Sequence, residues 1–258
     1  MIRYSEKSDM DKKDNMKKLT IINMYGNIYW PKNNEKYKNA SNIKYVIMPQ
    51  FRSDDCLYRI VKELGFTCKY NKNPIDTGLT DDIVEFDNMR LIWPLPCRSN
   101  IVPKELNRFN LVKEHMDYVN EIAAFHANAI FDFVEDDNIV VIDVSNMDYT
   151  YNDTYFQICS KCYQILRQRY KKIYVVYIGT VTTLLRPKRG LVIDNGVRSY
   201  FSDCIIDWSI SEILCREKQH IRSIPELIEM ASEIHSIKFH EIVEQILSEQ
   251  ILLREEKK

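Results

Sequence analysis

The sequence predicts an α/β fold in which a mostly parallel sheet is flanked by helices. Through the middle of the chain, helical and strand patterns alternate, as crossover connections require. The apolar run NIVVIDVS (Asn138 to Ser145) is typical of a central strand covered on both faces. The chain has 258 residues and 45% hydrophobic content, which is enough for one large α/β domain with extensions.

The amino-terminal part predicts a tail followed by strands. Met1 to Lys17 is charged and almost without large apolar residues, which favours a mobile tail, residues 1–17. Lys18 to Trp30 predicts a strand pair that turns near Gly26. Asn42 to Met48 then predicts the first buried strand, and Ser53 to Gly65 a short helix with an N-cap and a glycine stop. Further strands are expected in FTCKY and in DDIVEFDNMRLIWP.

Two helices and two strands are predicted in the centre. Apolar residues from Val112 to Phe133, His126 among them, recur at steps of three and four, which indicates a helix of about six turns. The segment from Asp153 to Tyr170 predicts a second helix. YVVYIG and LVIDNG, within Tyr174 to Gly196, predict an antiparallel hairpin that closes the sheet. The α/β domain is therefore expected to span residues 18–206.

Residues 207–258 predict a helical carboxyl-terminal extension. Ser223, Pro225 and Glu226 match the cap, first turn and capping box of a helix. Its apolar stripe is expected to pack on the body of the protein or on a partner. The residues of this stripe are Ile228, Ala231, Ile234, Ile237, Ile242, Val243 and Ile246.

Charge and cysteine content bound the functional classes. The 36 basic and 37 acidic residues nearly cancel, so nucleic acid or an anionic membrane would have to be bound through a local patch. Seven cysteines without regular spacing, and no apolar run long enough to span a bilayer, lead us to expect a reducing, cytoplasmic compartment and no membrane partner.

Motifs for catalysis or metal binding are weak. The six glycines are scattered singly, so neither a Walker loop nor a G-x-G-x-x-G fingerprint occurs. Cys159 and Cys162 have zinc-like spacing and could be joined by Cys215 and His220, but both lie on the apolar face of the predicted helix, where a thiol is an ordinary small hydrophobe. We therefore expect no metal, and no catalytic or cofactor-binding residues are assigned.

Two basic segments are candidate contacts for RNA or for an acidic partner. The alternative is that they form the solvated end of a helix, where cations are favoured by the helix dipole. The candidate residues are Arg167, Arg169, Lys171, Lys172, Arg186, Lys188 and Arg189.

The order of elements from Glu114 to Arg198 resembles the last third of FtsJ-like S-adenosylmethionine-dependent methyltransferases, a Rossmann-like fold whose sheet closes with an antiparallel hairpin. Working members carry a glycine-rich loop after the first strand, whereas PQFRSDD follows NIKYVIM here. They also use a lysine and a glutamate where this chain has Asp143 or Val144 and Gly190 or Leu191. The resemblance thus implies a pseudoenzyme with no cofactor.

The segments DDCLYRIVKELGFTCKYN, DDIVEFD and IFDFVEDDNIVVIDV, with the helical tail, fall in an order similar to that of the small stimulatory subunits of poxvirus mRNA capping enzymes. This resemblance implies a catalytically inactive regulatory subunit in a heterodimer with a larger catalytic subunit, whose cap guanine-N7 methyltransferase it stimulates. It would place the protein in the host cytoplasm or the virion.

Two other hypotheses remain open. The chain could be an active RNA 2'-O-methyltransferase with a degenerate loop, in which Asp82 or Asp87 holds the cofactor and Lys44 joins the reaction. It could also be a structural protein-interaction module.

Overall fold

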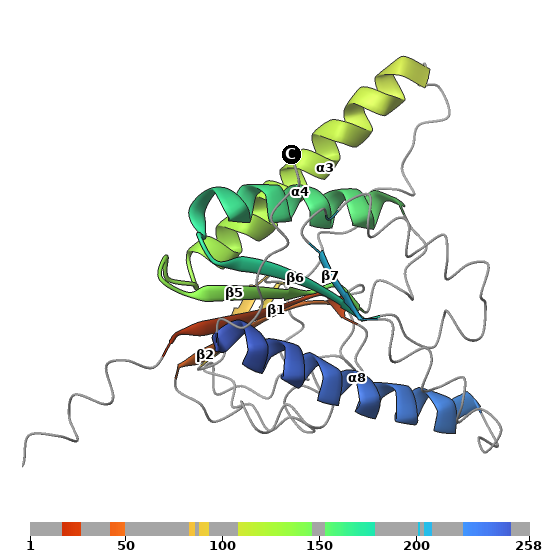
Figure 1. Ribbon diagram of the computed structural model, residues 1–258. Coiled ribbons are helices and arrows are strands. Elements are labelled where there is room, and N and C mark those ends of the chain that lie inside the picture. The colour runs from red at the N-terminus through yellow and green to blue at the C-terminus, as the bar shows by residue number, and fades with distance from the viewer. Residues whose placement is uncertain are drawn as a thin grey trace, which may run out of the picture.

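A computed structural model gives the architecture of the protein (Figure 1). It describes residues 17–26, 42–49, 83–85, 88–92, 108–145, 153–178, 201, 204–207 and 224–248. Within these residues, helices lie on both faces of a single seven-stranded sheet. The α/β class predicted from the sequence is therefore confirmed.

Six of the seven strands run parallel. Their order, β4-β2-β1-β5-β6-β7, is 3-2-1-4-5-6 when these six are numbered along the chain, which is compatible with a Rossmann-like fold. The short strand β3 pairs antiparallel with β4 at one edge. The strands are β1 (Leu19–Gly26), β2 (Ile43–Pro49), β3 (Ile83–Glu85), β4 (Met89–Ile92), β5 (Ile139–Asp143), β6 (Ile173–Ile178) and β7 (Cys204–Asp207).

The predicted closing hairpin is wrong. The two neighbours of β6 in the sheet are β5 and β7, and β6 runs parallel to both. The partner strand expected within Leu191 to Gly196 lies outside the described residues. Two apolar runs joined by a proline-containing turn suit a hairpin, but the same pattern also occurs when the chain leaves the sheet and returns in parallel. The sequence analysis missed β7, a strand of only four residues that ends one residue beyond the expected domain boundary.

The expected strand pair in Lys18 to Trp30 is also wrong, because its first arm is a central strand. β1 lies between β2 and β5 and is parallel to both, with Leu19 opposite Ile43 and Ile139. The first strand of the parallel order is therefore β1, and not the segment Asn42 to Met48. The alternation in LTIINM is compatible with either arrangement, so only the long-range pairing decides between them.

The two predicted central helices are confirmed as α3 (Arg108–Phe131) and α4 (Asp153–Arg169), and both cover one face of the sheet (Figure 1). Alternate residues of the strands face these helices and form the larger core. β5 contributes Val140 and Ile142, and β6 contributes Val175 and Tyr177. All five residues of β5 are buried, which confirms it as a central strand.

Helix α8 (Ile224–Leu247) covers the opposite face (Figure 1). Its buried apolar side chains, among those described, are Phe239, Ile242, Val243 and Ile246, at helical spacing. Ile237 is 52% exposed, so its predicted place in the buried stripe is wrong. It is two residues from the buried His235 and therefore lies about 200° around the helix from it. No helix among the described residues is long and apolar enough to cross a lipid bilayer.

Several predictions fall on residues that are not described. These are the tail before Lys17, the helix from Ser53 to Gly65, the strand FTCKY, and the residues that follow α8 after Ser248. The predicted strands within DDIVEFDNMRLIWP are confirmed as β3 and β4.

Candidate functional site

The strand order identifies the part of the sheet where ligands bind in doubly wound folds. The chain proceeds from β1 toward β2 on one side and places β5 on the other, so the switch point lies between β1 and β5. Sites in such sheets lie beyond the carboxyl ends of the two strands that flank this point. Asn23 and Asp143 are register partners near those ends.

Three buried polar side chains come together there on the face that α8 covers. Asn23 of β1 is 3% exposed, Asp143 of β5 is 4% exposed, and His235 of α8 is 7% exposed. His235 Nε2 lies 3.6 Å from Asp143 Oδ2, which is an ion pair when the imidazole is protonated but is too long for a hydrogen bond. Asn23 Oδ1 has no hydrogen-bond partner among the described residues.

Ser145 extends this cluster along the edge of the sheet. Its backbone N–H donates to Asp143 Oδ1 at 2.9 Å, and its hydroxyl oxygen accepts a hydrogen bond from the Ile178 N–H, also at 2.9 Å. Burial by itself would raise the pKa of Asp143. The interaction with His235 and the hydrogen bonding from Ser145 outweigh burial and hold that pKa below its usual value. The carboxylate is therefore kept ionised by protein groups on both of its oxygens.

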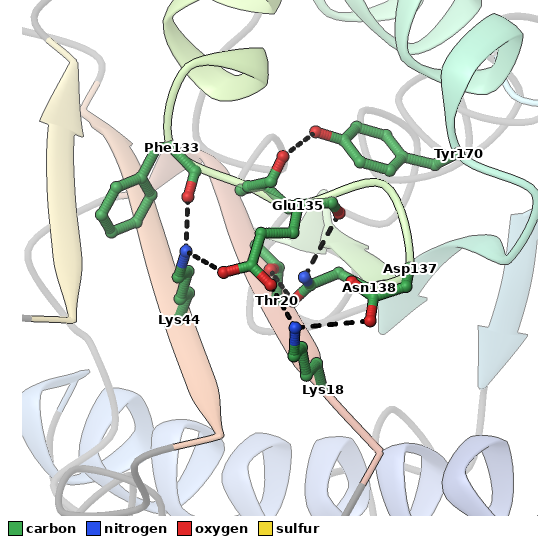
Figure 2. Close-up of polar contacts among 9 residues, drawn as sticks. Lys18, Thr20, Lys44, Phe133, Glu135, Asp137, Asn138 and Tyr170 are labelled. Carbon is green, nitrogen blue, oxygen red and sulfur yellow. Dashed lines mark hydrogen bonds and ion pairs between the residues drawn. The ribbon is translucent and has the colours of Figure 1, made fainter.

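A second polar network lies at the opposite, amino end of the sheet (Figure 2). Lys44 Nζ donates to the Phe133 carbonyl oxygen at 2.7 Å and lies 3.5 Å from Glu135 Oε1. Lys18 forms ion pairs with Glu135 and with Asp137, the latter at 3.4 Å. These carboxylates raise the pKa of Lys18, and Lys18 lowers the pKa of Glu135 in turn. This network fixes the turn between α3 and β5 against the starts of β1 and β2.

The same corner caps the carboxyl end of α3. Two carbonyl oxygens of its last turn, which lack partners within the helix, accept hydrogen bonds from Arg90 Nη1 (to Ala129, 2.7 Å) and Arg169 Nη1 (to Phe131, 3.3 Å). The Tyr170 hydroxyl donates to the carbonyl oxygen of Val134, in the turn that follows the helix, at 3.0 Å. Cations at this end also interact favourably with the helix dipole. The network therefore explains these side chains structurally.

The candidate RNA-binding or partner-binding cations are only partly described. Arg169 forms an ion pair with Asp136 and lies over the Phe131 ring, 4.7 Å from its centroid. Arg167 lies 5.6 Å from the centroid of the Tyr163 ring. Lys171 and Lys172 are exposed in the turn that precedes β6, at the amino end of the sheet. The remaining candidates, Arg186, Lys188 and Arg189, lie outside the described residues.

The cysteine pair is part of the core. Cys159 and Cys162 are both fully buried in α4, and burial raises the pKa of Cys162 to about 12. Cys215 and His220 lie outside the described residues. Among the residues that are described, no group of three or more His, Cys, Asp or Glu side chains could hold a metal ion. The hydrophobic interpretation of the two thiols is therefore the one that the geometry favours.

Sequence reasoning missed Asn23 and His235 as members of the cluster. Asn23 interrupts the apolar strand LTIINM, and a polar residue inside such a strand was the available signal. His235 lies on the buried face of α8, but its meeting with Asp143 depends on which face of the sheet α8 covers. Comparisons with protein family models, with curated proteins and with solved structures found no match to this chain.

Proposed function

We propose that this chain is a non-catalytic, methyltransferase-like subunit that binds a larger mRNA capping enzyme and stimulates its cap guanine-N7 methyltransferase. The observation that carries the proposal is the identity of the strands that flank the switch point. With β1 as the first strand and β2 as the second, a nucleoside cofactor would be held by the turn after β1 and by the end of β2. The sequence has no cluster of glycines at the first position and no carboxylate at the second.

The first of these positions follows β1. Close approach of backbone amides to a nucleotide or adenosyl group needs several glycines in this turn. The sequence at this point is GNIYWPKNN, with Gly26 followed by Ile28, Tyr29 and Trp30. The next glycine is Gly65. A glycine-rich segment is thus absent from the sequence after Gly26, as it is after Met48.

The second position is the end of β2, where folds of this class place an acidic residue that binds the ribose hydroxyls. Here β2 ends in Met48 and Pro49, followed by Gln50 and Phe51. None of these side chains is a carboxylate. The two deficiencies are independent in sequence, and both favour a protein that acts by contact with another protein.

The parallel pairing of β7 departs from the antiparallel closure of methyltransferases. The proposal therefore rests on the order of the first five parallel strands, on the two cofactor positions and on the sequence resemblance to capping-enzyme small subunits. The alternative of an active 2'-O-methyltransferase requires Lys44 near the reacting group. Lys44 Nζ instead donates to the Phe133 carbonyl oxygen at the amino end of the sheet, away from the switch point. Asp82 and Asp87 lie outside the described residues.

The test has two parts. Calorimetry of the isolated chain with S-adenosylmethionine should give no binding at micromolar concentrations, with an active cap methyltransferase as the positive control. The chain should then be co-expressed with the large capping-enzyme subunit of the same source, and methyl transfer to capped RNA measured with and without it. We expect a stable complex and a faster reaction. Methyl transfer by the isolated chain would refute the proposal, and a complex without a rate change would support the interaction-module alternative.

A further inference from the structure

The polar cluster at the carboxyl end of β5 joins three elements of the fold in one chain of contacts. It runs from His235 of α8 to Asp143 of β5, through Ser145, to the N–H of Ile178 at the end of β6. We propose that this chain is a conformational coupling device, through which the docking of α8 controls the order of the backbone at the carboxyl ends of β5 and β6. The inference is independent of the proposed partner.

The geometry of Asp143 makes the coupling possible. Its two carboxylate oxygens face different elements, because Oδ2 lies 3.6 Å from His235 Nε2 while Oδ1 accepts the Ser145 N–H at 2.9 Å. The carboxylate is planar and rigid, so a rotation that improves one contact changes the other. Without His235, the buried carboxylate would lose the side chain that faces its Oδ2, and a turn toward solvent would become more favourable.

Ser145 transmits the constraint to β6. Its N–H is held by Asp143, and its hydroxyl oxygen holds the Ile178 N–H at 2.9 Å. Ser145 is 1% exposed, so each of these hydrogen bonds lies in a low-dielectric setting in which loss of one partner leaves a costly unsatisfied group. Displacement of Asp143 therefore shifts Ser145, and with it the last residue of β6.

His235 differs from the other buried residues of α8 because it faces Asp143, although its ring also stacks on that of Phe239, with the two centroids 6.0 Å apart. The apolar contacts of α8, such as Phe239 and Val243, are further along the helix, whose end reaches the start of β1, where Lys17 Nζ donates to the Leu247 carbonyl at 2.7 Å. α8 therefore runs along the sheet from its carboxyl edge to its amino edge (Figure 1). Packing along this length holds the helix on the sheet, while His235 links it to Asp143.

Hydrogen exchange of single amides tests the proposal directly. In the full chain, His235→Gln should speed exchange of the Ser145 and Ile178 amides about tenfold, a coupling within the range found for neighbours in one network. Val243→Ala, on the same buried face of α8, is the matched control. It should loosen α8 while it leaves those two amides within about twofold of their original rates. Equal effects of the two variants, or no effect of His235→Gln on Ile178, would overturn the coupling.

Reciprocity gives a second, stricter measurement. A coupling between two sites acts equally in both directions, so Ser145→Ala should speed hydrogen exchange of the α8 amides around Phe239. In a double-mutant cycle, the combined effect of Ser145→Ala and His235→Gln on these rates should differ from the sum of the single effects. If His235→Gln fails to fold, Asp143→Asn keeps the shape of the side chain and an acceptor for the Ser145 N–H, but removes the charge that faces His235. Additive effects of Ser145→Ala and the His235 or Asp143 variant would refute the proposal.

Discussion

Acidification should destabilise this protein through His126, and the effect should disappear when that residue is replaced by leucine. His126 of α3 is 1% exposed, and neither ring nitrogen has a hydrogen-bond partner among the described residues. Burial disfavours the imidazolium and lowers the pKa of His126 from 6.5 to about 4. The folded protein thus keeps a neutral imidazole where the unfolded chain takes up a proton.

The sign and size of the effect follow from this difference. Between pH 6.5 and pH 4 the unfolded chain binds more protons than the folded protein, so the free energy of unfolding falls as the pH falls through that window. The two pKa values correspond to a total loss of about 3 kcal/mol, of which about 2 kcal/mol is reached at pH 5. Above pH 7 the contribution is close to zero.

Urea denaturation at pH 7, 6 and 5 measures this loss. His126→Leu should remove about 2 kcal/mol of the decline between pH 7 and pH 5, while its stability at pH 7 stays close to that of the original protein. Val119→Ala, a buried and non-titrating change in the same helix, should lower the stability by the same amount at each pH. A wild-type decline that persists unchanged in His126→Leu would refute the reasoning.

Three further predictions concern the polar corner and the core. Thr20→Val removes the buried hydrogen bond to Asn138 Oδ1, 3.0 Å long, and should cost about 1–2 kcal/mol in urea denaturation; a change near zero would mean that the bond is replaced. Arg90→Met keeps the stem but loses the cap on α3 and the cation over the Phe133 ring, and should cost about 2 kcal/mol, with Arg90→Lys restoring less than half. Cys162, with a pKa of about 12, should react with a thiol reagent at pH 8 about a thousandfold more slowly in the folded than in the unfolded protein, and equal rates would contradict its burial.

The sequence allowed the elements in the middle of the chain to be predicted because their periodicity is local. The repeat from Val112 to Phe133 and the apolar run at β5 need no knowledge of distant partners, and both are confirmed. Strand pairing could not be predicted in the same way. The apolar pattern of β1 suits a hairpin arm and a central parallel strand equally, and the difference decides which loop could hold a ligand.

The candidate site was harder to predict for the same reason. Asp143 was visible as the end of a buried strand, but Asn23 and His235 join it only because β1 lies next to β5 and α8 covers that face. Arg169 illustrates the opposite case. Its basic neighbourhood predicts a contact for RNA or a partner, which stays a prediction, and what only the structure shows is its hydrogen bond to the end of α3 and its ion pair with Asp136.

The central place of β1 has a consequence for synthesis of the chain. β1 is made before both of its neighbours, and one of them, β5, follows roughly 110 residues later, a delay on the order of ten seconds at usual translation rates. During that interval the emerging polypeptide presents one bare, apolar strand edge to other nascent chains. Ribosome-associated chaperones would be needed most before Ile139 leaves the exit tunnel, and fragments that stop short of it should aggregate.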